Sequence, residues 1–109
     1  MHELAITQNI VEGVVERTGK ARVLSLQLEI GKLSGVIPEA IRFCFDLVAE
    51  GTPMEGARLD IDEPEGRAQC SSCGEEFSPR GWVVLCDCGS SDVELLHGTG
   101  LRIRSVEVV

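Results

Sequence analysis

The chain has 109 residues, of which 43% are hydrophobic but only 4% aromatic, which is enough for one compact domain with an aliphatic core and one small additional module. Its formal net charge of −8 argues against nucleic-acid binding, because that function needs a basic surface to displace phosphate counterions. No stretch is long and apolar enough to cross a bilayer, and no secretory signal precedes the first predicted helix. We therefore expect a cytoplasmic protein that binds neither nucleic acid nor membrane.

The first predicted element is a helix from about Glu3 to Thr18, because apolar side chains recur on one side at helical spacing. This apolar stripe consists of Leu4, Ile10, Val11, Val14 and Val15. A strand is predicted from Arg22 to Gly31, where apolar and polar residues alternate. The side chains expected on its buried face are Leu24, Leu26, Leu28 and Ile30.

The second helix is predicted over residues 38–50, because a proline suits the first turn and Gly51 follows as a stop. A short strand is predicted over residues 57–63, again from alternation. The last predicted strand covers residues 101–109. Its alternation changes phase near Ser105, which predicts a β-bulge or a swap of faces.

This order of elements predicts an α+β fold with a two-layer α/β domain, in which two helices lie on one side of a small three-stranded sheet. A zinc-ribbon module is inserted before the last strand. We expect the α/β domain to comprise residues 1–66 plus 99–109 and the zinc-binding domain residues 67–98, with short hinges near Gly66 and Gly98.

Four cysteines, spaced C-x2-C-x12-C-x-C, form the strongest chemical motif of the chain. They are Cys70, Cys73, Cys86 and Cys88. Two close thiolate pairs on a short loop suit tetrahedral Zn²⁺. Each pair is followed by a glycine, which allows the positive φ that turns backbone N–H groups toward the sulfurs. We therefore predict a structural zinc site.

Other uses of this cluster are less favoured. A disulfide framework needs an oxidising compartment, for which the sequence carries no signal. Four thiolates could also hold iron in a rubredoxin-like centre. A thioredoxin-type redox pair would need a strand leading into a helix, whereas the Cys70–Cys73 pair enters a turn.

The N-terminus offers a second metal site of a different kind. The α-amine of Met1, the backbone nitrogen of His2 and its imidazole can close fused chelate rings around one ion. Planar nitrogen coordination of this kind suits Ni²⁺ or Cu²⁺ more than Zn²⁺. Glu3 would add a backbone nitrogen or a carboxylate. From composition alone, an incidental histidine at a frayed terminus remains open.

Several other residues are expected to be structural. Cys44 lies on the apolar face of the second predicted helix as a core thiol, and Trp82 covers the zinc site. His97 is expected to face solvent, with an auxiliary metal ligand as the alternative. The arginines of the last strand are expected to pair with carboxylates of a neighbouring strand: Arg102, Arg104, Asp60 and Asp62.

Together these features resemble the HypA/HybF family of nickel-incorporation metallochaperones of [NiFe]-hydrogenase maturation. The resemblance covers essentially the entire chain. The segments that carry it are Met1-His2-Glu3-Leu4, Glu29-Ile30-Gly31-Lys32-Leu33, Arg42-Phe43-Cys44-Phe45, Glu50-Gly51-Thr52, the cysteine pairs with Cys88-Gly89-Ser90, and Leu101-Arg102-Ile103-Arg104-Ser105-Val106-Glu107-Val108.

The resemblance implies a carrier rather than an enzyme, and no nucleophile elbow, phosphate loop or dinucleotide fingerprint is present in the sequence. It implies Ni(II) as transient cargo at Met1, His2 and Glu3, and structural Zn(II) on the four cysteines. It also implies two partners, the GTPase HypB and the [NiFe]-hydrogenase large-subunit precursor, while some members serve urease. We expect a monomer or weak homodimer.

One departure from the family pattern concerns the second cysteine pair. The family usually shows C-P-x-C there, whereas Cys86-Asp87-Cys88 is one residue shorter. A single intervening residue in an extended chain still points both sulfurs the same way, so we expect four thiolates. The alternative is that His97 replaces one cysteine. The alternative function is a zinc-ribbon adaptor that bridges proteins without binding nickel.

Overall fold

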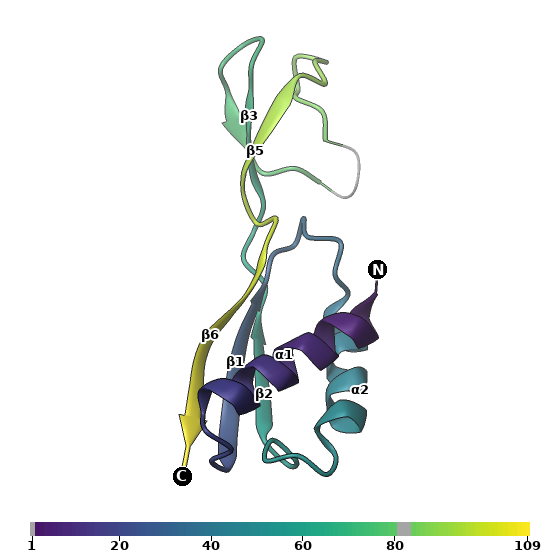
Figure 1. The fold of residues 1–109 in the computed structure, drawn as a ribbon. Coiled ribbons are helices and arrows are strands. Elements are labelled where there is room, and N and C mark those ends of the chain that lie inside the picture. Colours follow the sequence, from purple (N-terminus) through teal and green to yellow (C-terminus); the bar gives the residue numbers. More distant parts are fainter. Residues whose placement is uncertain (1, 81–83) are drawn as a thin grey trace.

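The computed structural model describes residues 2–80 and 84–109 and arranges them in two lobes joined by a narrow neck (Figure 1). The molecule is elongated, with principal extents of 52 × 21 × 17 Å. Two of the predicted site residues, Met1 and Trp82, lie outside the described residues. No helix in the described part of the chain has both the length and the apolar character needed to cross a bilayer.

The lower lobe contains two helices and a three-stranded sheet, as predicted. The helices are α1 (Glu3–Arg17) and α2 (Pro38–Ala49), and the strands are β1 (Val23–Ile30), β2 (Arg58–Asp62) and β6 (Leu101–Val108). The strand order is β2-β1-β6, with β1 parallel to β2 and antiparallel to β6. The first and last strands of the chain are therefore neighbours.

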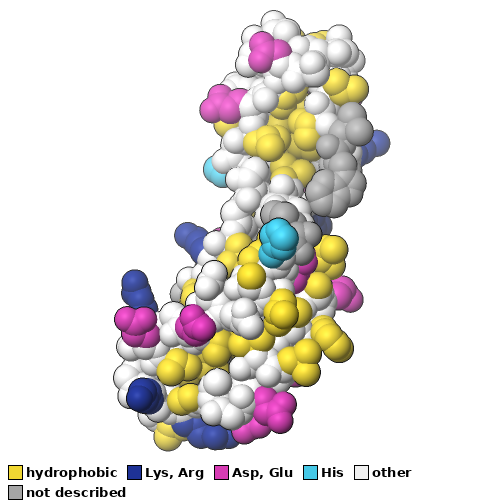
Figure 2. All heavy atoms as spheres, turned by 45° about the vertical axis from the view of Figure 1, so that its right-hand side comes forward, with side chains coloured by type: hydrophobic (Ala, Val, Ile, Leu, Met, Phe, Trp, Pro, Cys, Tyr) yellow, Lys and Arg dark blue, Asp and Glu magenta, His cyan; other side chains and the backbone are white. Residues whose placement is uncertain are grey.

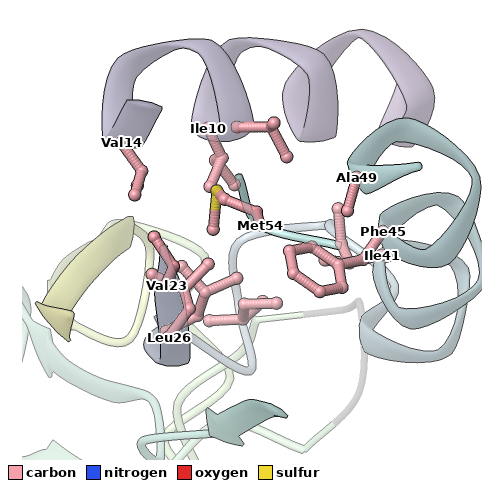
Figure 3. Packing of buried hydrophobic residues seen from close by; sticks show 11 residues of the cluster. Ile10, Val14, Val23, Leu26, Ile41, Phe45, Ala49 and Met54 are labelled. Carbon is pink, nitrogen blue, oxygen red and sulfur yellow. The ribbon is translucent and has the colours of Figure 1, made fainter. Parts of the chain in front are cut away.

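The core of this lobe lies between the helices and one face of the sheet. Its central strand contributes Leu26, Leu28 and Ile30, each at most 1% exposed. Side chains from both helices and from Met54 point at this strand (Figure 3). The aliphatic composition explains this packing, because Phe45 is the one aromatic side chain in the core cluster of the described residues.

Three predictions about the helices and β1 are wrong in detail. Leu4 is 50% exposed, and Leu24 is 46% exposed rather than buried. The register of β1 against β6 shifts between Val23 and Ser25, so Leu24 is an extra residue and Ser25 is buried in its place. Cys44, predicted to be a core thiol, is only half-buried.

The predicted change of phase in the last strand is confirmed. The pairing of β6 with β1 passes from Ser105 opposite Gln27 to Ile103 opposite Leu28, so Arg104 is an extra residue in β6. The predicted arginine pairs are found only in part, because Asp60 pairs with Arg58 and β2 is separated from β6 by β1. Arg104 contacts Asp62 at 3.6 Å, while Arg102 contacts Glu29 at 2.7 Å, a partner that was not predicted.

The upper lobe is a second small sheet of order β4-β3-β5. Its strands are β3 (Arg67–Cys70), β4 (Glu76–Phe77) and β5 (Val93–His97), and both pairings are antiparallel. Among the described residues of this lobe, the buried apolar side chains are only Ala68, Cys70 and Cys86. Such a core is too small to hold the lobe together by burial alone, which is the usual situation of a metal-stabilised module.

The neck is formed by three chain segments that meet at glycines. A Cβ atom on Gly31 would lie 2.1 Å from the carbonyl oxygen of Gly98, and a Cβ on Gly98 would lie 2.7 Å from the Cα of Gly66. Backbone hydrogen bonds join the same segments, including Leu33 N–H to the Gly98 oxygen at 2.8 Å. The positions predicted as hinges are therefore in close backbone contact.

Candidate metal centres

The four cysteine sulfurs converge in the upper lobe and lie within 4.8 Å of one another. The Sγ atoms of Cys70 and Cys88 are 3.7 Å apart, and those of Cys73 and Cys86 are 3.5 Å apart. A tetrahedral ion with Zn–S bonds of about 2.3 Å separates its sulfurs by about 3.8 Å. The cluster therefore has the size that a zinc ion requires.

Each cysteine pair sits on a tight turn held by backbone hydrogen bonds. In the first, Gly74 N–H donates to the oxygen of Cys70 and has φ 78°. In the second, Gly89 N–H donates to the oxygen of Cys86 and has φ 90°. The first turn is closed by a bond from residue i+4 to residue i and the second by a bond from i+3 to i, so the shortened pair builds a turn that is one residue tighter. In both turns the glycine that follows the pair has positive φ, as expected.

Serine side chains connect the two turns, a role that was not predicted. The hydroxyls of Ser72 and Ser90 lie 2.9 Å apart, and the Ser90 hydroxyl accepts the N–H of Asp92. The N–H of Ser71 donates to the oxygen of Asp92. The sequence signal for this link is weak, because serine is common in any turn.

The ionisation of the thiols also suits a cation. The N–H of Cys73, with that of Ser72 and the neighbouring thiols, outweighs burial and lowers the pKa of Cys70 to about 6. For Cys86, the N–H of Cys88 favours the thiolate, but burial and the three other thiols outweigh it and raise the pKa to about 12. Without an ion, the cluster holds some thiolate charge but not four charges at once.

His97, the alternative zinc ligand, lies away from this cluster. It pairs with Arg67 at one end of the β3–β5 ladder, whereas Cys70 pairs with Val93 at the other end. Its side chain is exposed, as predicted. Among the described residues, the group of histidine, cysteine and acidic side chains that could hold a metal consists of the four cysteines.

Of the predicted nickel residues, His2 and Glu3 lie at the start of α1, at the end of the lower lobe that faces the cysteine lobe (Figure 1). His2 is exposed and precedes the helix, and its carbonyl oxygen accepts the N–H of Ile6 at 3.0 Å. The imidazole is therefore carried on a rigid helical turn while its ring remains open to solvent.

Glu3 is largely buried, with 9% of its surface exposed. Its Oε2 accepts the N–H of Ile37 at 3.2 Å, just before α2, and this bond lowers the pKa of its carboxyl group. A carboxylate at a helix N-terminus also interacts favourably with the helix dipole. Glu3 thus ties the start of α1 to the start of α2, a role that sequence reasoning missed.

The chain is similar to known proteins over essentially its whole length. The profile of the family described as "Hydrogenase/urease nickel incorporation, metallochaperone, hypA" matches residues 1–108. The hydrogenase maturation factor HypA of Geobacter metallireducens is 47% identical over 109 residues, covering 99% of each chain. That of Trichormus variabilis is 48% identical over 108 residues, covering 99% of this chain and 96% of its own.

The fold is also found among solved structures. The solution structure of the Ni metallochaperone HypA from Helicobacter pylori superimposes with a TM-score of 0.67. The alignment covers 100% of this chain and 98% of that one, with 22% sequence identity. This likeness confirms the predicted α+β architecture.

Proposed function

Because the chain belongs to the HypA family of nickel-incorporation metallochaperones of hydrogenase maturation, we propose that it binds Ni(II) at its N-terminus and delivers it to a [NiFe]-hydrogenase precursor. The observation that carries this proposal is the placement of His2. Its imidazole is exposed beside the chain terminus, while the helix immediately behind it is anchored by Glu3.

The proposed nickel ligands are the nitrogens of Met1 and His2, with Glu3 in a supporting role. The buried Glu3 carboxylate already accepts a hydrogen bond from the N–H of Ile37. We therefore assign the carboxylate to fixing the start of α1 and the backbone nitrogen of Glu3 to binding nickel. An exposed nitrogen site that must lose protons to bind a metal is suited to cargo, because a carrier has to release its ion.

The zinc ion that the cysteine cluster would hold is proposed to be structural. Four thiolates would complete its coordination and leave no open position for a substrate. Residues 67–98 would then fold as a zinc-binding domain, separate from the nickel-binding domain of residues 1–66 plus 99–109. The four thiols need a reducing environment to remain free of disulfide bonds, which supports a cytoplasmic location.

Two partners follow from family membership: the GTPase HypB, which would exchange nickel with this chain, and the large-subunit precursor of a [NiFe]-hydrogenase. We propose a non-catalytic carrier that acts as a monomer or weak homodimer and binds neither nucleic acid nor membrane. The charge of −8 supports the absence of nucleic-acid binding.

The test is a calorimetric nickel titration of zinc-loaded protein, with absorption spectra recorded in parallel. His2→Ala is the test variant, and His97→Ala is its matched control because the chain has only two histidines. Wild type and His97→Ala should bind one nickel ion, and His2→Ala should bind none. Equal binding by all three, or by none, would contradict the carrier site and leave a zinc-ribbon adaptor as the function.

A further inference from the structure

The outer surface of the two helices carries large apolar side chains that do not enter the core. Leu4 on α1 is 50% exposed, and Phe43 and Leu47 on α2 are 70% and 57% exposed. Hydrophobic side chains gather in a band across this face of the lower lobe (Figure 2). An apolar surface of this kind on a small acidic protein marks a contact site.

On α1, the apolar band follows one side of the helix. Val11 and Val15 lie one turn apart and line a hollow of about 630 Å³, which the segment Gly51–Pro53 closes from the other side. Leu4 precedes Val11 by two turns and so lies on the same side. The hollow therefore lies on the same side of α1 as the exposed Leu4.

On α2, the band follows the side that faces α1. The opposite flank of α2 faces β2, because Arg42 donates to the Leu59 oxygen at 2.8 Å and Asp46 lines a hollow with the same strand. Leu47 and Val48 lie on the other flank, and Phe43 extends it by one turn. The groove therefore comprises the hollow beside α1 together with the exposed Leu4, Phe43 and Leu47 on the outer faces of the two helices.

Acidic side chains border this groove on both helices. The border on α1 consists of Glu12 and Glu16, and that on α2 of Glu39 and Glu50. All four are exposed, and the ion pairs found among the described residues use other carboxylates. Lys20 lies at one end of the hollow. The groove is apolar along its floor and negative along both margins.

We propose that this groove is the docking site for an amphipathic helix of a partner protein, with apolar residues at i, i+3, i+4 and i+7 flanked by lysine or arginine. Charge complementarity selects the basic flanks. The occupant is a helix because an apolar groove between two helices offers no backbone partners, and a helix satisfies its own N–H and C=O groups.

The same charge pattern argues against two other occupants. A second copy of this chain would present its own acidic margins to those of the first, since an isologous contact pairs a surface with itself. An anionic membrane would be repelled by the four carboxylates. The inference deepens the proposed function, because the groove begins at Leu4, two residues from the proposed nickel ligand His2, so a bound partner would lie beside the ion.

The test uses a designed, fluorescein-labelled helical peptide of about 18 residues, roughly five turns, with leucines at the stated spacing and flanking lysines. Binding to the zinc-loaded full chain is followed by fluorescence anisotropy. The peptide should bind, and the version with glutamate in place of lysine should bind at least about tenfold more weakly. Amide chemical shifts should change along α1 and α2. Shifts confined to other surfaces would overturn the proposal.

Substitutions in the groove distinguish binding at this site from non-specific binding of the peptide. Leu47→Gln and the double change Glu12→Lys with Glu16→Lys should each weaken peptide binding about tenfold. Their matched controls are Leu24→Gln, at a leucine on the sheet that is 46% exposed against 57% for Leu47, and Glu107→Lys on β6; both should bind as wild type. Undiminished binding by the groove variants, with their circular dichroism unchanged, would refute the assignment.

Two further measurements test the alternative occupants and the link to nickel. Sedimentation that shows a wild-type dimer dissociated by Leu47→Gln would assign the groove to a second copy. Co-sedimentation of the protein with phosphatidylserine vesicles, lost in Leu47→Gln, would assign it to a membrane; either result overturns the proposal. His2→Ala should bind the peptide normally, while Leu47→Gln should bind nickel normally. If the nickel site were disproved, the docking site would still stand, and if the docking site were disproved, the nickel site would still stand.

Discussion

Substitution of a neck glycine tests whether the close backbone approach at the neck stabilises the protein. A Cβ on Gly31 would lie 2.1 Å from the oxygen of Gly98 and 2.3 Å from its carbonyl carbon. These are backbone atoms and cannot rotate away, so the segments must separate by about 1.3 Å to reach an ordinary van der Waals distance. Gly31→Ala should therefore push the two backbone segments apart at this point.

The expected loss of unfolding free energy follows from the hydrogen bonds that this separation would break. Three backbone bonds cross this point: Gly31 N–H to Gly100, Lys32 N–H to Pro64 and Leu33 N–H to Gly98, at 2.9, 3.1 and 2.8 Å. A shift of that size takes each beyond hydrogen-bonding distance. At about 1 kcal/mol each, the loss is about 3 kcal/mol of unfolding free energy.

The assay is urea denaturation of zinc-loaded protein, followed by the circular dichroism of the two helices. Gly31→Ala should lower the unfolding free energy by about 3 kcal/mol, and the melting temperature by about 12 °C or more. Gly13→Ala is the control, because nothing lies within 4 Å of its Cβ position inside α1, and it should stabilise by about 1 kcal/mol. Gly31→Ala with wild-type stability would refute the close packing of the neck.

Three other predictions concern the metal sites. Cys88→Ala should lose tightly bound zinc, as measured by competition with a colorimetric chelator, and the control Cys44→Ala should keep it. Full retention of one tightly bound zinc ion in Cys88→Ala would exclude the four-thiolate site. The N–H of Glu75 and the Cys86 thiol favour the Cys73 thiolate, but burial and the thiols of Cys70 and Cys88 outweigh them and raise the pKa of Cys73, while the pKa of Cys86 stands at about 12. Zinc binding at pH 7 should therefore release at least two protons, so that apparent affinity rises about 100-fold per pH unit. Calorimetry in buffers of different ionisation enthalpy counts these protons, and fewer than two would contradict the thiol environments. Glu3→Ala should speed amide hydrogen exchange at Ile37 about tenfold and weaken nickel binding, because the Ile37 N–H loses its acceptor. Glu3→Gln keeps an acceptor oxygen and should change the exchange rate and the nickel affinity less. Equal effects of the two substitutions would show that the charge of Glu3, and not its hydrogen bond, matters.

The sequence allowed the helices, the three-stranded sheet and the cysteine cluster to be predicted, because each depends on a local pattern. The helical period identified α1, and Pro38 with Gly51 marked the ends of α2. The phase change near Ser105 indicated the bulge in β6. The spacing of the cysteines predicted their convergence without any knowledge of β3 and β5, which are too short to leave a recognisable alternation.

What could not be predicted depends on contacts between distant segments. The bulge in β1 comes from its pairing with β6, which turns Leu24 outward against its own alternation. Leu4 continues the apolar stripe of α1, and periodicity cannot distinguish a stripe that fills a core from one that lines a surface groove. The bond from Ile37 N–H to Glu3 joins residues 34 positions apart, so no local motif contains it.

The pairing of β1 with β6 also bears on the order in which the chain folds. The strands β2 and β6 are separated by roughly 38 residues, and an open loop of that length must lose entropy before β6 can join the sheet. Once the cysteines hold zinc and β3 pairs with β5, the same connection behaves as a loop of roughly 7 free residues. The difference in closure entropy is about 1.5 kcal/mol. A structural ion in the upper lobe would therefore favour completion of the sheet in the lower lobe by about that amount.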